Sequence, residues 1–171
     1  MNSRNLLLIG ALIASTTSAL AAEPIPVGNF KAWDAYYSTE SGGKTCFAAT
    51  QPTNSNYSRP IASRGKAYLM LTTMPSKSIK NEVSTIIGFP FKAASEVTVD
   101  VDGTKFKMFY NDGTDQTAWA VPDQEAALVD AMKKGTKMSV SSTSSRGTDV
   151  TDNYSLSGIT AALDAVAKEC P

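Results

Sequence analysis

Four aspartates gather around two adjacent turns, and they are the side chains of this sequence best suited to chemistry. They are Asp100, Asp102, Asp112 and Asp115. Carboxylate oxygens are preferred ligands of Ca²⁺, and two carboxyl groups form the catalytic pair of most glycosidases, which need no histidine. The segment Asp-Val-Asp-Gly is more compressed than a calcium-loop pattern and lacks a bidentate Glu at the required distance. We therefore interpret the aspartates as turn residues and keep a carboxylate-dependent glycan-acting enzyme as the alternative function.

The chain contains no histidine. This absence removes the usual general base, the commonest metal ligand, and every Ser-His-Asp or Cys-His arrangement. The two cysteines do not form a Cys-x-x-Cys motif, and two thiols cannot supply the four ligands of a structural zinc site. No motif that activates a serine, a phosphate or a metal-bound water is present. The sequence predicts no catalytic residue, no cofactor and no metal site, and hence a protein that is not an enzyme.

The first residues read as a secretory signal peptide. Arg4 provides a positive start, residues 6–14 an apolar stretch, and Ala19-Leu20-Ala21 a small-residue cleavage site. The apolar stretch is about half as long as a membrane-spanning helix, and nothing comparable follows it. We expect residues 1–21 to be removed, leaving a periplasmic protein, free, envelope-associated or secreted, with no transmembrane segment in the mature chain.

Residues 22–171 have the size of a single domain. Removing 21 of the 171 residues leaves 150, enough to bury about 70% of the unfolded surface. Loss of Arg4 from a chain with 16 basic and 16 acidic residues leaves a formal charge of −1, which favours neither nucleic acid nor anionic membrane as a partner. Cys46 and Cys170 are the only cysteines, and such a pair in an exported protein predicts one disulfide.

The clearest local pattern predicts a β-hairpin over residues 97–110. Two alternating runs meet at Asp102-Gly103, a dipeptide typical of tight hairpin turns. Each run has one apolar face, because side chains alternate along a strand. The residues predicted to form one wall of the core are Val97, Val99, Val101, Phe106 and Met108, joined by Trp119.

The remaining patterns indicate short strands and two helices. Further strands are predicted over 67–73, 82–88, 136–145 and 150–156, and a polar surface loop over 51–64. One helix should begin at Pro122 and end before Gly135, and another should follow Ser157 with Cys170 on its buried stripe. Many short strands with few helices favour a mainly β fold, a β-sandwich with one or two short appended helices.

Aromatic side chains and one Arg-Gly segment have both structural and binding interpretations. The segment 146–149 reads Arg-Gly-Thr-Asp, in which a threonine interrupts the integrin-type Arg-Gly-Asp, so we predict an ordinary turn. Trp33 and Trp119 are predicted to lie in the core, although aromatic rings also line grooves for sugars or peptides. Tyr36 and Tyr37 must point to opposite faces of a strand, and which one is exposed stays open.

The order and spacing of several segments resemble the invasion-associated locus B family of exported bacterial proteins. The resemblance implies an immunoglobulin-like β-sandwich in the periplasm or envelope, with the two cysteines paired. It implies no known reaction and no catalytic residues; some members are associated with host-cell invasion. The residues that carry the resemblance are Trp33, Cys46, 81–84, 87–89, 118–120, 132–135, 146–148, 152–158, 161–163 and Cys170.

Two classes of function follow. The first is a noncatalytic interaction module that binds another envelope protein, a glycan or a host component. The second is the carboxylate-dependent enzyme. Two carboxyl groups about 5 to 10 Å apart in a cleft would favour the enzyme, whereas an exposed sheet edge or apolar patch would favour the binding module.

Overall fold

The computed structural model describes residues 23–40, 42–111 and 115–171, so the predicted signal peptide and Asp112 lie outside the described residues. The chain is mainly β with two short helices, as predicted. The strands are β1 (Ile25–Phe30), β2 (Trp33–Glu40), β3 (Gly43–Thr50), β4 (Asn54–Tyr57), β5 (Tyr68–Met74), β6 (Ile79–Ile86), β7 (Val97–Val101), β8 (Thr104–Phe109), β9 (Thr117–Ala120), β10 (Lys137–Thr143) and β11 (Asp149–Ser155), and the helices are the 3-10 turn η1 (Pro75–Lys77), α1 (Pro122–Lys134) and α2 (Ile159–Glu169).

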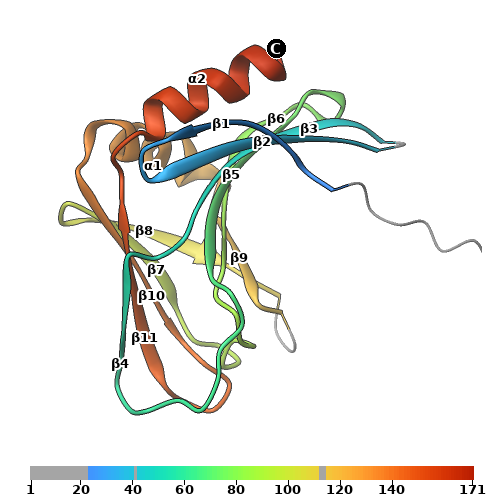
Figure 1. Ribbon diagram of the computed structural model, residues 1–171. Coiled ribbons are helices and arrows are strands. Elements are labelled where there is room, and N and C mark those ends of the chain that lie inside the picture. The colour runs from blue at the N-terminus through green and yellow to red at the C-terminus, as the bar shows by residue number, and fades with distance from the viewer. Residues whose placement is uncertain (1–22, 41, 112–114) are drawn as a thin grey trace, which may run out of the picture.

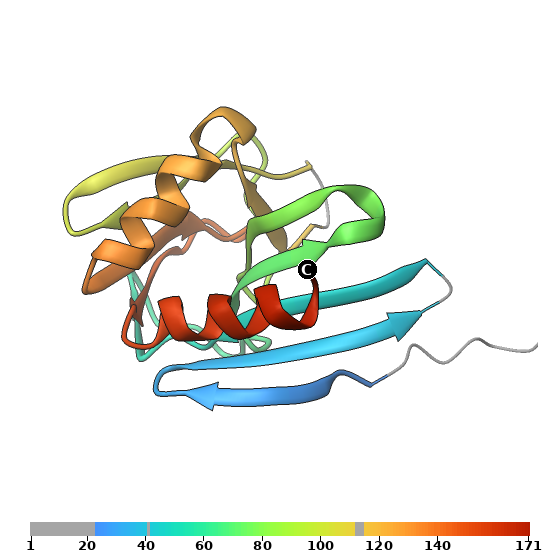
Figure 2. The same ribbon diagram turned by 90° about the horizontal axis from the view of Figure 1, so that it is seen from above.

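All the strands belong to one antiparallel sheet in the order β1-β2-β3-β5-β6-β9-β8-β7-β10-β11-β4. The sheet bends strongly, so that β1, β2 and β3 cross the top of Figure 1 beneath α2 while β4, β10 and β11 run down one side. Seen from above, α2 lies along the first strands, as Figure 2 shows. The result is a β-sandwich-like fold in which one continuous sheet supplies the walls, consistent with the predicted fold class.

The predicted hairpin is confirmed, and its register places the expected residues inside. Val97 pairs with Met108 and Val99 with Phe106, and all four side chains are buried. On the other side of β7, Val99 is opposite Val140 of β10, and the Val140 side chain is fully buried. The hairpin therefore forms a central wall of the core.

The placement of Trp119 in this wall was wrong. Ala118 and Ala120 are buried, and alternation along β9 turns Trp119 to the opposite face, where it is half-buried. Its ring lies 6.0 Å, centroid to centroid, from that of the exposed Phe109. The strand alternates in the usual way, but with the small residues inward and the large one outward.

Trp33 lies in the core as predicted, at the corner where β11 leads into α2. It is fully buried, and its indole Nε1 donates a hydrogen bond of 3.0 Å to the carbonyl of Ser155. At the same corner Gly158 has φ +98°, and a Cβ there would lie 1.8 Å from the carbonyl oxygen of Phe30. Only glycine fits both the backbone angle and this close approach.

Both predicted helices are present with buried apolar stripes. Pro122 opens α1 and Gly135 follows its last turn, while Leu128, Val129 and Met132 face the core. In α2 the buried residues are Ile159, Ala162, Leu163 and Val166. In the described part of the chain, no helix is long and apolar enough to cross a membrane.

The predicted surface loop over 51–64 is partly wrong. Residues 54–57 form β4, which pairs antiparallel with β11 and is one edge of the sheet. Its sequence, Asn-Ser-Asn-Tyr, carries no apolar alternation, because an edge strand exposed to water needs none. The chain after β4 then passes beside the residues that follow β6, where the Gly65 amide donates a hydrogen bond to the Gly88 carbonyl.

Candidate functional site

The structure places Asp100 and Asp102 in turn-forming hydrogen bonds. Asp100 Oδ1 accepts a bond of 2.7 Å from the amide of Gly103. Asp102 accepts bonds from the amides of Thr136, at 2.7 Å, and Lys137, at 3.1 Å. These bonds, chiefly the one from Thr136, lower the pKa of Asp102 below its ordinary value. Both carboxylates thus fasten the β7–β8 turn and the start of β10, as turn residues do.

The predicted aspartates do not assemble into a metal site in the described part of the chain. Asp112 lies outside the described residues, and Asp115 precedes β9 in a half-buried position. Among residues 23–40, 42–111 and 115–171, no group of three Asp, Glu, Cys or His side chains could hold a metal ion.

One cavity of about 460 Å³ is bordered by carboxylates, namely Glu96 and Asp100. It is also bordered by Lys105 and Lys107, and Lys107 Nζ lies 3.1 Å from Glu96 Oε1. The negative charges here are therefore accompanied by positive ones.

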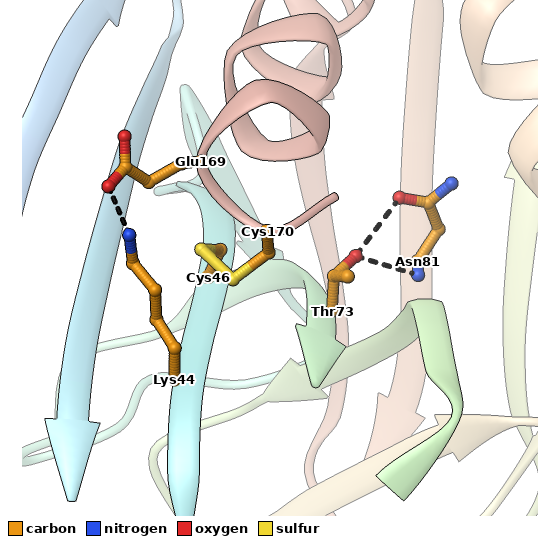
Figure 3. The surroundings of a disulfide bond; sticks show 6 residues. All are labelled: Lys44, Cys46, Thr73, Asn81, Glu169 and Cys170. Carbon is orange, nitrogen blue, oxygen red and sulfur yellow. Dashed lines mark hydrogen bonds and ion pairs between the residues drawn. A yellow bond between two sulfur atoms is a disulfide. The ribbon is translucent and has the colours of Figure 1, made fainter. Parts of the chain in front are cut away.

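Cys46 of β3 and Cys170, just after α2, form a disulfide, as Figure 3 shows. The two residues are 0% and 4% exposed, so the sulfurs are shielded from solvent. Beside them Lys44 forms an ion pair with Glu169, as Figure 3 shows. The Lys44 Nζ also lies 4.4 Å from the centre of the Tyr37 ring. The disulfide and the ion pair both fasten the end of α2 to β3.

On the other side of the disulfide, Figure 3 shows Asn81 against Thr73. Asn81 has φ +57°, and its amide donates a bond of 3.2 Å to Thr73 Oγ1. The β5–β6 register is irregular at this point, and Asn adopts the left-handed conformation more readily than most residues. The Asn81-Glu82 segment thus has an architectural role, shaping a bulge.

The tyrosines take opposite faces of β2, as alternation requires. Tyr37 packs against the core, whereas Tyr36 stacks on Phe47, with ring centroids 5.3 Å apart. Both tyrosines are half-buried, so neither is the freely exposed ring that the sequence left open. Trp119 lies on the same face of the sheet as Tyr36. The successive pairings of β2 with β3, β3 with β5, β5 with β6 and β6 with β9 connect the two residues.

An arginine and an aspartate that the sequence analysis did not single out form a buried ion pair. Arg64 Nη1 and Nη2 donate to Asp152 Oδ1 and Oδ2 at 2.7 and 2.5 Å, a bidentate arrangement. The Arg64 side chain is 9% exposed and that of Asp152 is 1% exposed. Ser55 also donates to Asp152, at 2.6 Å, and Arg64 Nε donates to the carbonyl of Ile87, at 2.6 Å.

This pair fixes the segment after β4 against β11 and the end of β6. Burial alone would lower the pKa of Arg64, but hydrogen bonds to Asp152 and Tyr57 and their charges outweigh it and raise the pKa. The guanidinium therefore stays charged, and it lies 5.0 Å from the centre of the Phe89 ring. The sequence contains one indication of this ion pair, because Asp152 lies between Val150 and Tyr154 on the inward face of its strand.

The backbone of the segment after β4 also lies very close to the backbone just after β6. The Gly65 amide donates a bond of 2.9 Å to the Gly88 carbonyl. Gly88 has φ +73°, and a Cβ there would lie 2.3 Å from the Gly65 carbonyl oxygen. Any larger residue at Gly88 would push the segment after β4 away from β6.

The fixed segment forms one wall of a cavity of about 640 Å³. Residues 59–65 supply this wall, 88–90 another, and the turn between β10 and β11 a third. Three of the residues that line the cavity are arginines, Arg59, Arg64 and Arg146, and none of the described lining residues is acidic. We call this the arginine cavity and take it as the candidate site.

The turn that carries Arg146 is confirmed as an ordinary turn. The Gly147 amide donates 2.7 Å to the Ser144 carbonyl, and the Thr148 amide donates 3.1 Å to Ser144 Oγ. Arg59 Nε donates 3.0 Å to Thr148 Oγ1, and its Nη2 donates to the Arg146 carbonyl. The turn therefore holds the Arg59 guanidinium at the edge of the cavity.

These features define a disulfide-stapled, β-sandwich-like domain with a cavity that three arginines help to line. The model of the Invasion associated locus B (IalB) protein family matches residues 33–167, and the chain belongs to this family. A similar solved structure is the crystal structure of invasion associated protein B from Bartonella henselae, at 14% identity and a TM-score of 0.58. The match covers 86% of this chain and 98% of that one, and it shows a shared fold. None of the curated proteins matches the chain.

Proposed function

We propose that this protein is a noncatalytic binding protein of the bacterial envelope. In this proposal residues 1–21 are a cleaved signal peptide, and residues 22–171 act in the periplasm as one domain. Membership in the invasion-associated family and a buried disulfide, which suits an oxidising compartment, support this. The partner is an envelope protein, a glycan or a host component, and the function contributes to host-cell invasion or to the envelope itself.

The observation that carries the proposal is that several of the groups able to do chemistry have structural partners in the described part of the chain. Asp100 and Asp102 accept backbone hydrogen bonds, Asp152 is paired with Arg64, and both thiols are in the disulfide. The arginine cavity offers guanidinium groups, which donate hydrogen bonds but do not exchange protons at physiological pH. Such a cavity suits recognition better than acid–base catalysis.

The alternative, a carboxylate-dependent glycan-acting enzyme, would need two carboxyl groups facing one cleft. The cavity bordered by Glu96 and Asp100 has two carboxylates at its edge. Glu96 is engaged by Lys107, and Asp100 by a turn amide. These engagements favour the binding function over the enzyme.

The test replaces Asp100, Asp102, Asp112 and Asp115 together by Asn. Parent and variant are compared in glycan hydrolysis and in partner capture from crosslinked envelope, with circular dichroism to verify folding. We expect no hydrolysis from either protein and unchanged capture. Hydrolysis by the parent that disappears in the folded variant, with capture intact, would overturn the noncatalytic proposal.

A further inference from the structure

Two of the three arginines of the cavity carry charge that the described protein does not neutralise. Arg64 is paired with Asp152, but neither Arg59 nor Arg146 has a carboxylate within ion-pair distance among the described residues. The neighbouring Asp149 does not line the cavity, and its Oδ1 accepts a bond of 2.8 Å from the Thr143 hydroxyl. The edge of the cavity therefore has two positive charges in excess.

Arg59 is held in place before any ligand arrives. Two of its five N–H groups bind Thr148 Oγ1 and the Arg146 carbonyl, which leaves three without a partner in the described part of the chain. A fixed guanidinium loses little side-chain entropy when it binds, and it presents a planar fork that suits an oxyanion. The site is thus preorganised for an anion.

The rest of the cavity is partly apolar. Ile61, Phe89 and Val150 contribute to its lining, together with two prolines, Pro60 and Pro90. Phe89 is itself held by the guanidinium of Arg64, 5.0 Å from its ring centre. A ligand that fills this space would place an apolar group against these side chains and its anionic group at the rim.

We propose that the arginine cavity binds a phosphate monoester carried by an apolar group. A phosphate monoester has a charge of about −1.5 to −2 at pH 7 and three strong acceptor oxygens, matching the two unpaired guanidinium groups better than a single carboxylate does. Arg59 and Arg146 hold the phosphate, and Phe89 and Ile61 contact the apolar group. This inference rests on the binding function proposed above and names the class of its ligand.

The test is calorimetric titration of the mature, disulfide-bonded protein with phenyl phosphate. The double variant R59Q/R146Q removes both unpaired charges, and K105Q/K134Q removes two exposed charges elsewhere as a matched control. Each arginine should contribute about tenfold, so the first variant should bind about a hundredfold more weakly while the control binds normally. Phenylacetate should bind more weakly than phenyl phosphate, and binding should weaken as salt is added.

Two further arms keep the result interpretable. Arg59 donates hydrogen bonds that R59Q removes, so the single variant R146Q is measured as well. The Arg146 side chain has no hydrogen bond within the described residues, and R146Q should bind about tenfold more weakly than the parent. Vesicles containing phosphatidic acid, compared with phosphatidylcholine alone, distinguish a lipid from a soluble source of the phosphate. If the phosphatidic acid vesicles capture the protein and phenyl phosphate displaces it from them, the source is a lipid. If the protein binds phenyl phosphate but not these vesicles, the source is soluble.

Equal loss of binding in the arginine variant and the lysine control, or no saturable binding of phenyl phosphate, would overturn the inference. Partner capture that persists under those outcomes leaves the binding function standing. Release of phenol from phenyl phosphate would instead contradict the noncatalytic function. The two proposals therefore fail in distinguishable ways.

Discussion

Breaking the buried ion pair should destabilise the protein more than any exposed charge substitution. Truncating Asp152 to Ala leaves the Arg64 guanidinium, 9% exposed, without its bidentate partner. Truncating Arg64 leaves a carboxylate that is 1% exposed. Removing one member of a buried pair typically costs about 3 to 5 kcal/mol, a large part of the roughly 5 to 15 kcal/mol that holds such a domain folded.

The assay is a double-mutant cycle by urea denaturation with the disulfide intact. Because the two side chains share one interaction, the double variant should cost about 1 to 3 kcal/mol less than the sum of the two single changes. The exposed pair Lys107 and Glu96, with side chains 69% and 77% exposed, serves as control and should couple by less than about 1 kcal/mol. Additive effects of Arg64→Ala and Asp152→Ala would refute this account of how the segment after β4 is held.

Three further predictions concern the core, the corner before α2 and one half-buried carboxyl group. Val99→Asp should destabilise by several kcal/mol because it buries an unpaired charge, whereas Lys105→Glu should change the free energy of unfolding by about 0.5 kcal/mol or less; equal effects in urea titrations would disprove the register. Gly158→Ala should cost more than about 2 kcal/mol, since its Cβ would lie 1.8 Å from a carbonyl oxygen, and a normal melting temperature would contradict the local geometry. Burial raises the pKa of Glu125 above its ordinary 4.5, so ionisation of this carboxyl group disfavours the folded state as the pH rises. Glu125→Gln should therefore be more stable than the parent at pH 7, and the difference should close near pH 3, where the parent carboxyl group is protonated. A variant that is less stable than the parent at pH 7 would contradict this prediction.

The elements that the sequence predicted well are those whose local pattern and burial agree. Alternation around Asp102-Gly103 specified both the turn and the inward residues of the hairpin, because a one-residue slip would expose every valine. Pro122 and Gly135 marked the two ends of α1, because proline suits the first position of a helix and glycine commonly follows its last turn. The prediction that Trp119 lies in the core was wrong because a large apolar ring is not by itself evidence of which face of a strand it occupies. In Ala-Trp-Ala the two alanines face inward, and alternation then turns the ring outward.

The candidate site was harder to predict because its parts are distant in sequence. Arg64 lies in a polar stretch with no periodicity, and its partner Asp152 is 88 residues away. An aspartate at an inward strand position signals a buried cation, but nothing local identifies which one. The approach of Arg59 to the turn at Arg146 likewise depends on how β4 pairs with β11, and an edge strand of polar residues leaves no apolar pattern.

Partner capture from crosslinked intact envelope tests whether this protein binds its partner through the arginine cavity. The parent, R59Q/R146Q and K105Q/K134Q are compared at equal amounts of folded protein. We expect capture to fall by at least about tenfold only in the arginine variant, and phenyl phosphate to compete with capture by the parent. Equal capture by all three proteins, unaffected by phenyl phosphate, would contradict this expectation.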